Sequence, residues 1–114
     1  MNNFKRGVFA LLGLTLMALT LSAASAEEFE LIIEHTEIQE TDIKPKVGDT
    51  IKFVNKADIA HNLYLTYEDG SVLNLDTQFP GTSKTALLEK SGKVVVRCWI
   101  HPIIRLDIDV AEAD

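Results

Sequence analysis

The amino-acid sequence predicts an all-β domain, an antiparallel sandwich or small barrel of about seven or eight strands. Short runs rich in β-branched and aromatic residues recur along the chain, and turn-forming residues separate them at close spacing. No segment beyond the N-terminal one has the apolar periodicity of an amphipathic helix. In a chain of 114 residues, which is one domain at most, this pattern is typical of a sandwich.

The predicted strands are bounded by glycine, proline and short polar turns. In the second, Ile51 and Phe53 lie on one face, and the third alternates in the same way. In the last, Leu106, Ile108 and Val110 alternate with two aspartates, as in a sheet with one face in water. The seven runs, in order, are 29–35, 49–55, 63–67, 72–75, 85–88, 94–98 and 106–110.

The first 26 residues are predicted to be a secretory signal peptide. Lys5 and Arg6 form a positive start, an uncharged leucine-rich stretch follows, and Ala24-Ser25-Ala26 is a small-residue cleavage site. The apolar stretch is too short to span a bilayer comfortably. We therefore expect a periplasmic protein without a membrane anchor, with one mature domain at 27–114.

The composition of residues 27–114 restricts the classes of partner and of site. This segment holds all 17 acidic residues and nine of the 11 basic ones, a net charge of −8, so nucleic acid is a poor partner. Both methionines lie in the leader, and Cys98 is the only cysteine. A single cysteine in an exported protein is a free thiol, an intermolecular bridge or a metal ligand.

Two short segments carry candidate chemistry, Ala60-His61-Asn62 and Cys98-Trp99-Ile100-His101-Pro102. A thiolate and an imidazole three positions apart, where a strand ends, can meet one metal ion if the chain turns between them. A second imidazole, from His61, would complete a trigonal set that suits copper, whereas zinc usually takes a fourth strong ligand or a water. Taken singly, each of these residues is more typical of packing or of a hydrogen bond, so the prediction depends on their combination.

Three segments together resemble the cupredoxin family: Val-Gly-Asp-Thr-Ile-Lys-Phe-Val-Asn at 47–55, His61-Asn62, and Cys98-x-x-His101-Pro102. The resemblance extends from about Ile38 to Val110, and the short final loop is similar to that of the amicyanins. It implies a cupredoxin-like Greek-key sandwich and one type 1 copper ion with His61, Cys98 and His101 as ligands. It also implies that Asn62 ties the two ligand loops together by hydrogen bonds.

The axial position departs from the amicyanin-like pattern. The methionine expected three positions after the second histidine is replaced by Ile104, whose alkyl side chain cannot ligate a metal. Gln39 and Gln78 are poor substitutes, because an axial glutamine would be expected at that same position. The sequence therefore predicts a three-coordinate site with the Ala60 carbonyl as a distant donor, and a carboxylate or a water in the axial position stays open.

The resemblance implies that the second histidine reaches the surface inside an apolar patch where a redox partner docks. Ile100, Pro102 and Ile103 are candidates for this patch, and they fit equally well as an apolar cap on the sandwich. Trp99 and Tyr64 are interpreted as packing residues.

The predicted function is single-electron transfer between redox proteins, such as a cytochrome or a periplasmic dehydrogenase or oxidase. The protein is expected to be a monomer and not an enzyme, since the sequence offers no nucleophile–base pair and no paired carboxylates. Two alternatives stay open. One is a copper-binding or delivery protein that uses the same ligands without redox cycling, and the other is an interaction module without a metal.

Overall fold

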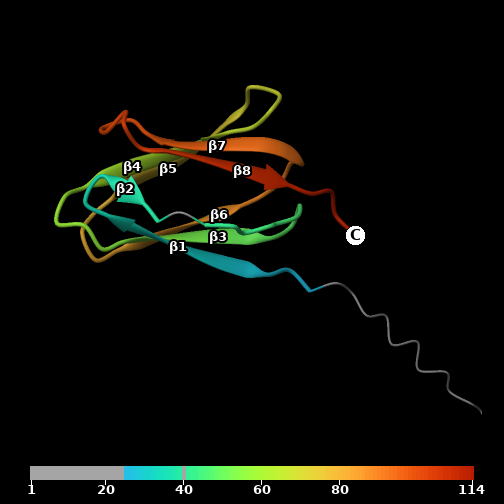
Figure 1. Ribbon diagram of the computed structural model, residues 1–114, viewed down its shortest axis with the longest axis horizontal. Coiled ribbons are helices and arrows are strands. Elements are labelled where there is room, and N and C mark those ends of the chain that lie inside the picture. Colours follow the sequence, from blue (N-terminus) through green and yellow to red (C-terminus); the bar gives the residue numbers. More distant parts are fainter. Residues whose placement is uncertain (1–24, 40) are drawn as a thin grey trace, which may run out of the picture.

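A computed structural model of the chain describes residues 25–39 and 41–114, so most of the predicted leader lies outside the described residues. The described part forms eight strands in two four-stranded sheets that pack face to face (Figure 1). The predicted all-β sandwich is therefore confirmed. Within the described ranges, no helix is long and apolar enough to cross a membrane.

The two sheets have the strand orders β2-β1-β3-β6 and β5-β4-β7-β8. All strand pairs are antiparallel except β1 and β3, which run parallel. The strands are β1 (Glu28–Glu34), β2 (Glu37–Ile38), β3 (Thr50–Asn55), β4 (His61–Thr66), β5 (Val72–Gln78), β6 (Ser83–Leu87), β7 (Gly92–Cys98) and β8 (Arg105–Val110).

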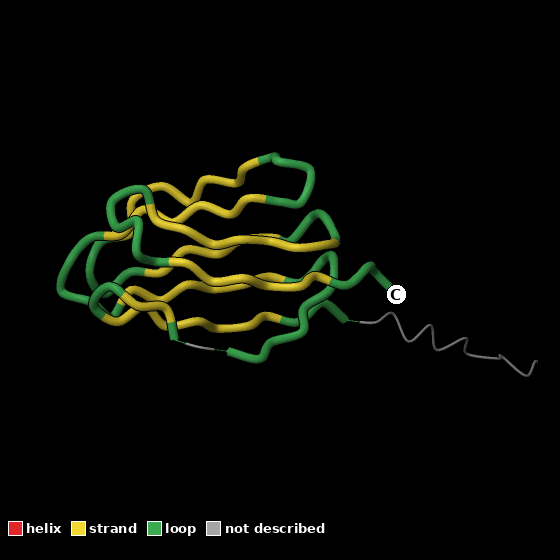
Figure 2. The backbone as a smooth tube through the Cα atoms, turned by 45° about the horizontal axis from the view of Figure 1, so that its top comes forward, coloured by secondary structure: helices red, strands yellow, loops and turns green. Residues whose placement is uncertain are grey.

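The parallel pair is where the fold differs from the antiparallel sandwich that the sequence predicts. A parallel pair needs a long connection, because the chain must return to the end of the sheet from which it started. The segment 41–49 makes the last part of this return and touches the other sheet through a bridge between Lys46 and Ala111 (Figure 2). Strand β2 is not predicted, since two residues carry no periodicity.

The core lies between the sheets and is apolar along most of its length. Ile51 and Phe53 of β3 face Leu63 and Leu65 of β4, and all four side chains are fully buried. This agrees with the alternation in the sequence. Among the described residues, four polar ones are also buried, Asp49, Asn55, His61 and Gln78.

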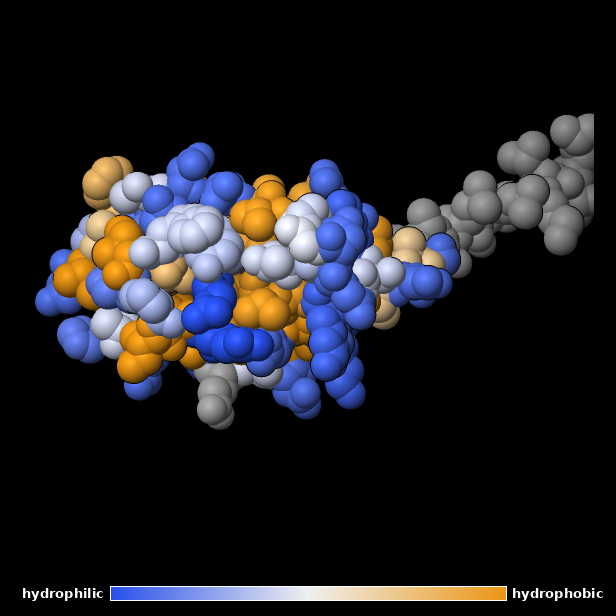
Figure 3. Space-filling view, turned by 90° about the horizontal axis from the view of Figure 1, so that it is seen from above, coloured by the Kyte–Doolittle hydropathy of each residue, from blue (hydrophilic) through white to orange (hydrophobic). Residues whose placement is uncertain are grey.

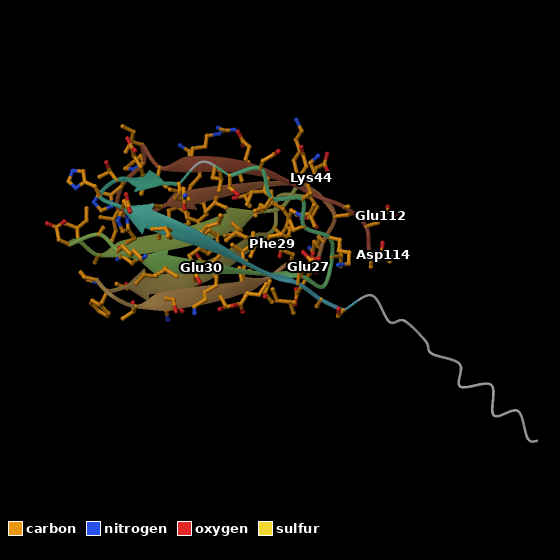
Figure 4. All side chains as sticks on the ribbon, turned by 60° about the horizontal axis from the view of Figure 1, so that its bottom comes forward. Glu27, Phe29, Glu30, Lys44, Glu112 and Asp114 are labelled. Carbon is orange, nitrogen blue, oxygen red and sulfur yellow. The ribbon has the colours of Figure 1, made fainter. Side chains whose placement is uncertain are left out.

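The two ends of the sandwich differ in character. Glu27, Lys44, Glu112 and Asp114 lie at the end where the chain enters and leaves (Figure 4). The opposite end carries the start of β4, the end of β7 and the loop between β7 and β8 (Figure 1). Hydrophobic side chains are interspersed with polar ones on the surface at that end (Figure 3).

Asp49 stabilises the first of these ends. Its carboxylate accepts hydrogen bonds from the backbone N–H groups of Glu27 and Lys46 and from Nζ of Lys46. Burial by itself would raise the pKa of Asp49, but these three donors outweigh it and hold the pKa below its usual value. The carboxylate thereby fastens the N-terminal segment to the start of β3.

Candidate metal centre

His61, Cys98 and His101 come together at the opposite end of the sandwich. His61 is the first residue of β4 and Cys98 the last of β7, and these strands are neighbours in one sheet. Sγ of Cys98 lies 3.9 Å from Nδ1 of His61 and 3.8 Å from Nδ1 of His101. One donor atom from each of the three residues lies within 4.8 Å of the others. The residues that the sequence selects therefore do lie together.

The spacing between these donors fits a single metal ion. With a metal–nitrogen bond of about 2.1 Å and a metal–sulfur bond of about 2.3 Å, sulfur and nitrogen lie about 3.8 Å apart in a trigonal plane and about 3.6 Å apart in a tetrahedron. The two observed sulfur–nitrogen distances, 3.9 and 3.8 Å, are close to these values, so one ion could contact the sulfur and both nitrogens. One thiol with two imidazoles in a trigonal set is the donor combination that copper takes in blue-copper sites.

Burial sets the charge state of the first histidine. His61 is fully buried, and burial lowers its pKa. The polar backbone of His35 opposes this shift in pKa, and the charges of His101 and His35 lower the pKa of His61 further. The neutral imidazole is the form that binds a metal. Although the sequence places His35 far from the site, the structure brings its backbone to the buried ring.

The backbone of Asn62 joins the two ligand segments. Its N–H donates to Sγ of Cys98 at 3.3 Å, and its carbonyl accepts from the N–H of Trp99 at 3.0 Å. The resemblance gives Asn62 the role of tying the loops together, and here the main chain makes both bonds. These two bonds hold the segment that carries Cys98 against the start of β4.

Trp99 holds the start of the ligand loop on the outer face of the sheet. Its ring stacks on Tyr64 with the centroids 3.8 Å apart and the planes at 16°. Its Nε1 donates to Oδ1 of Asn74 at 2.9 Å. This geometry agrees with the interpretation of both aromatic residues as packing residues. Because Cys98 directly precedes Trp99, the stack also restrains the thiol.

The remaining predicted residues divide into buried and exposed ones. Ile104 is buried in the core, and its N–H donates to the carbonyl of His101 at 3.0 Å, which closes the loop into a tight turn. Ala60 is half-buried directly before His61. Ile100 and Ile103 are 51% and 80% exposed, and Pro102 is exposed between His101 and Ile103.

Asn55 is a further residue that positions the site, and no motif in the sequence marks it as such. It ends β3 and is fully buried. Its Nδ2 donates to the carbonyls of Ile59 and Gln78, and its Oδ1 accepts from the N–H of Ala57. The bonds to Ile59 and Ala57 fix the loop that leads into His61, and the bond to Gln78 joins Asn55 to the end of β5. The only signal for Asn55 is its position at the end of the 47–55 segment.

The two-sheet fold is that of the cupredoxins, and a His-Cys-His group lies at one end of it. Amicyanin from Paracoccus versutus has the same fold, with a TM-score of 0.63 and 19% identity over 76% of this chain and 82% of that chain. A purple cupredoxin from Nitrosopumilus maritimus also shares it, with a TM-score of 0.59 and 20% identity over 73% of this chain and 99% of that chain. At such low identity the likeness shows the fold alone.

Sequence relatives define the family more narrowly, although no protein-family model matches the chain. The methylamine utilization protein MauL of Methylorubrum extorquens is 64% identical over 88 residues, which cover 77% of each chain. MauL of Methylophilus methylotrophus is 37% identical over 124 residues, covering 95% of this chain and 70% of the relative. The chain belongs to the MauL family.

Proposed function

We propose that this protein is a periplasmic copper protein that carries single electrons between redox partners and catalyses no reaction on a substrate. His61, Cys98 and His101 would be the ligands of one type 1 ion. The observation that carries the proposal is the convergence of one thiol and two imidazoles at sulfur–nitrogen distances of 3.9 and 3.8 Å. When bound there, copper would supply a one-electron couple between Cu(II) and Cu(I).

The protein's part is to hold the donors still. His61 and Cys98 lie in neighbouring strands of a hydrogen-bonded ladder, and the Asn62 backbone links the segments that carry them. The bond between the Ile104 N–H and the His101 carbonyl closes the third ligand's loop. Because a packed interior resists deformation, the donors keep one geometry through both oxidation states, which keeps the reorganisation on electron transfer small.

The route for electrons would leave through His101. This residue is only partly buried, and its neighbours Ile100, Pro102 and Ile103 are exposed. An apolar surface around the one ligand near solvent suits brief docking of a redox protein. The acidic residues at the far end of the sandwich lie away from this surface (Figure 4). Since the relatives are named methylamine utilization proteins, we place the partners in that process.

Copper loading of the exported protein tests this proposal. The full sequence is expressed in a bacterium with a periplasm, and the protein is purified from the periplasmic fraction. Its mass reports whether cleavage follows Ala26. We expect one equivalent of Cu(II) to give an intense visible band that disappears on adding ascorbate and is absent from Cys98→Ser. A protein that binds no copper, or whose band survives in Cys98→Ser, would contradict the proposal.

Copper delivery is the second candidate, and the burial of Ile104 favours it. The loop provides no axial donor at that position, and a site of low coordination number favours Cu(I). Copper exchange separates the two functions. A delivery protein should release Cu(I) rapidly to a competing chelator, whereas an electron carrier should retain it through repeated cycles of oxidation and reduction.

A further inference from the structure

A break in the alternation of β5 turns one polar side chain into the core beside the candidate ligands. Strand β4 buries His61, Leu63 and Leu65. On β5, Leu75 is buried, so regular alternation would point the side chain of Gln78, three residues later, toward solvent. Gln78 is instead fully buried.

A β-bulge causes this reversal. Asn62 pairs with Thr77 and Tyr64 with Asn74, so a step of two residues on β4 corresponds to three on β5. Asp76 lies within the longer step and has a φ of 60°, in the left-handed region that a residue with a Cβ adopts only at a cost. Bulges are enriched beside functional sites because they re-aim a side chain, and this one aims Gln78 inward.

The bulge brings Gln78 next to the first candidate ligand. Gln78 and His61 are direct partners across the β4–β5 ladder. Side chains of such partners lie on the same face of the sheet, with Cβ atoms about 5 Å apart. Both side chains are fully buried, so the amide of Gln78 occupies the same end of the core as the imidazole of His61.

The amide of Gln78 has no bonding partner in the part of the chain that the structure describes. Neither Oε1 nor Nε2 makes a hydrogen bond, although the backbone carbonyl of Gln78 accepts one from Asn55. A buried amide without partners is costly, and so is the left-handed backbone at Asp76 that places it. Both costs in free energy concern the position of the Gln78 amide, which indicates that this amide contacts a ligand.

We propose that the amide oxygen of Gln78 is a fourth, weak donor to the metal held by His61, Cys98 and His101. It approaches from β5 rather than from the loop that contains Ile104. The inference rests on the proposed copper site and adds to it the donor that the loop lacks. It also revises the view, taken from the sequence, that Gln78 is a poor substitute for an axial ligand.

Three variants of the full-length protein test the proposal. Gln78→Leu removes the amide and keeps the volume, and Gln78→Asn keeps the amide but shortens its reach by one methylene. Gln39→Leu is the matched control, because Gln39 is exposed in the segment after β2. The measurements are the thermal midpoint of the metal-free protein, the Cu(II) absorption and EPR spectra, and the reduction potential.

We expect both Gln78 variants to weaken Cu(II) binding about tenfold relative to Cu(I), which raises the reduction potential by about 59 mV. Their Cu(II) absorption and EPR spectra should shift toward those of a more trigonal copper site. Metal-free Gln78→Leu should melt at a higher temperature than the natural protein, because an unpartnered amide is gone, whereas Gln78→Asn should not. The control should change none of these quantities.

Unchanged spectra and potential in both Gln78 variants would overturn the inference and leave the copper site standing. The inference also fails if metal-free Gln78→Leu is destabilised while its copper properties stay unchanged, since Gln78 would then have a purely structural role. If Gln78→Leu fails to fold, the inference depends on the spectra of Gln78→Asn alone. A natural protein that binds no copper would refute both the proposed function and this inference.

Discussion

Replacing Asn55 with alanine should lower the free energy of unfolding more than an alanine substitution at almost any other polar residue. The side chain makes three hydrogen bonds. The bond from Nδ2 to the Gln78 carbonyl and the bond from the Ala57 N–H to Oδ1 are buried, and the bond from Nδ2 to the Ile59 carbonyl is partly buried. Each is worth about 1 kcal/mol net, and a partner left unsatisfied in the core costs about 1–3 kcal/mol. We therefore expect a loss of at least about 3 kcal/mol in the free energy of unfolding.

Urea denaturation and thermal melting of the metal-free protein measure this loss. For a domain of this size, about 3 kcal/mol corresponds to a fall of about 12–24 °C in the melting temperature. Asn74→Ala is the matched control, because Asn74 is exposed and its carboxamide accepts a single bond from Trp99. A loss below about 1 kcal/mol in Asn55→Ala would refute the reasoning, since that is the value of one ordinary hydrogen bond.

Three further predictions concern stability at low pH, the reduction potential and the docking surface. The folded pKa of Asp49 is lowered, so its contribution is complete above the usual carboxyl pKa of 3.8 and is lost as the pH falls through the lower folded value. The urea midpoint of the natural protein should therefore fall between pH 6 and pH 3, and it should fall less in Asp49→Asn. Asp58→Asn is the control, because Asp58 is exposed, and it should leave the fall in midpoint nearly unchanged. Ile104→Met should lower the reduction potential by adding a thioether donor, and an unchanged or higher potential would show that residue 104 is not axial. Ile103→Glu should slow electron exchange with a partner but leave the copper spectrum intact, because Ile103 is 80% exposed; an equal rate would remove it from the docking surface.

The sequence predicts the fold well because the strands carry their own signal. Alternation marks β3, β4 and β8 directly, and turn residues separate them. The pairing of strands carries no such signal. The parallel contact between β1 and β3 depends on where the chain returns after β2, which no local pattern encodes.

The candidate ligands could be predicted for a similar reason. Cys98 and His101 are close in the sequence, and His61 lies in a short segment that resembles a known family. Asn55 and Gln78 could not be found in this way, because their roles arise from contacts between distant segments. The inward turn of Gln78 further depends on the backbone of Asp76, and an aspartate in a strand does not by itself predict a bulge.

The buried polar residues are distributed unevenly, and this has a consequence for the metal-free protein. Asp49 is fully partnered at one end, whereas Asn55, His61 and Gln78 lie together at the other. Atoms of His61 and Gln78 lack partners there among the described residues. A ligand that binds only the folded state raises its stability by mass action. A metal at this end would therefore stabilise the part of the core whose polar groups have the fewest hydrogen-bond partners without it. In the metal-free protein, backbone amides near β4 should exchange hydrogen faster than those near Asp49. On loading with metal, exchange of the amides near β4 should slow down.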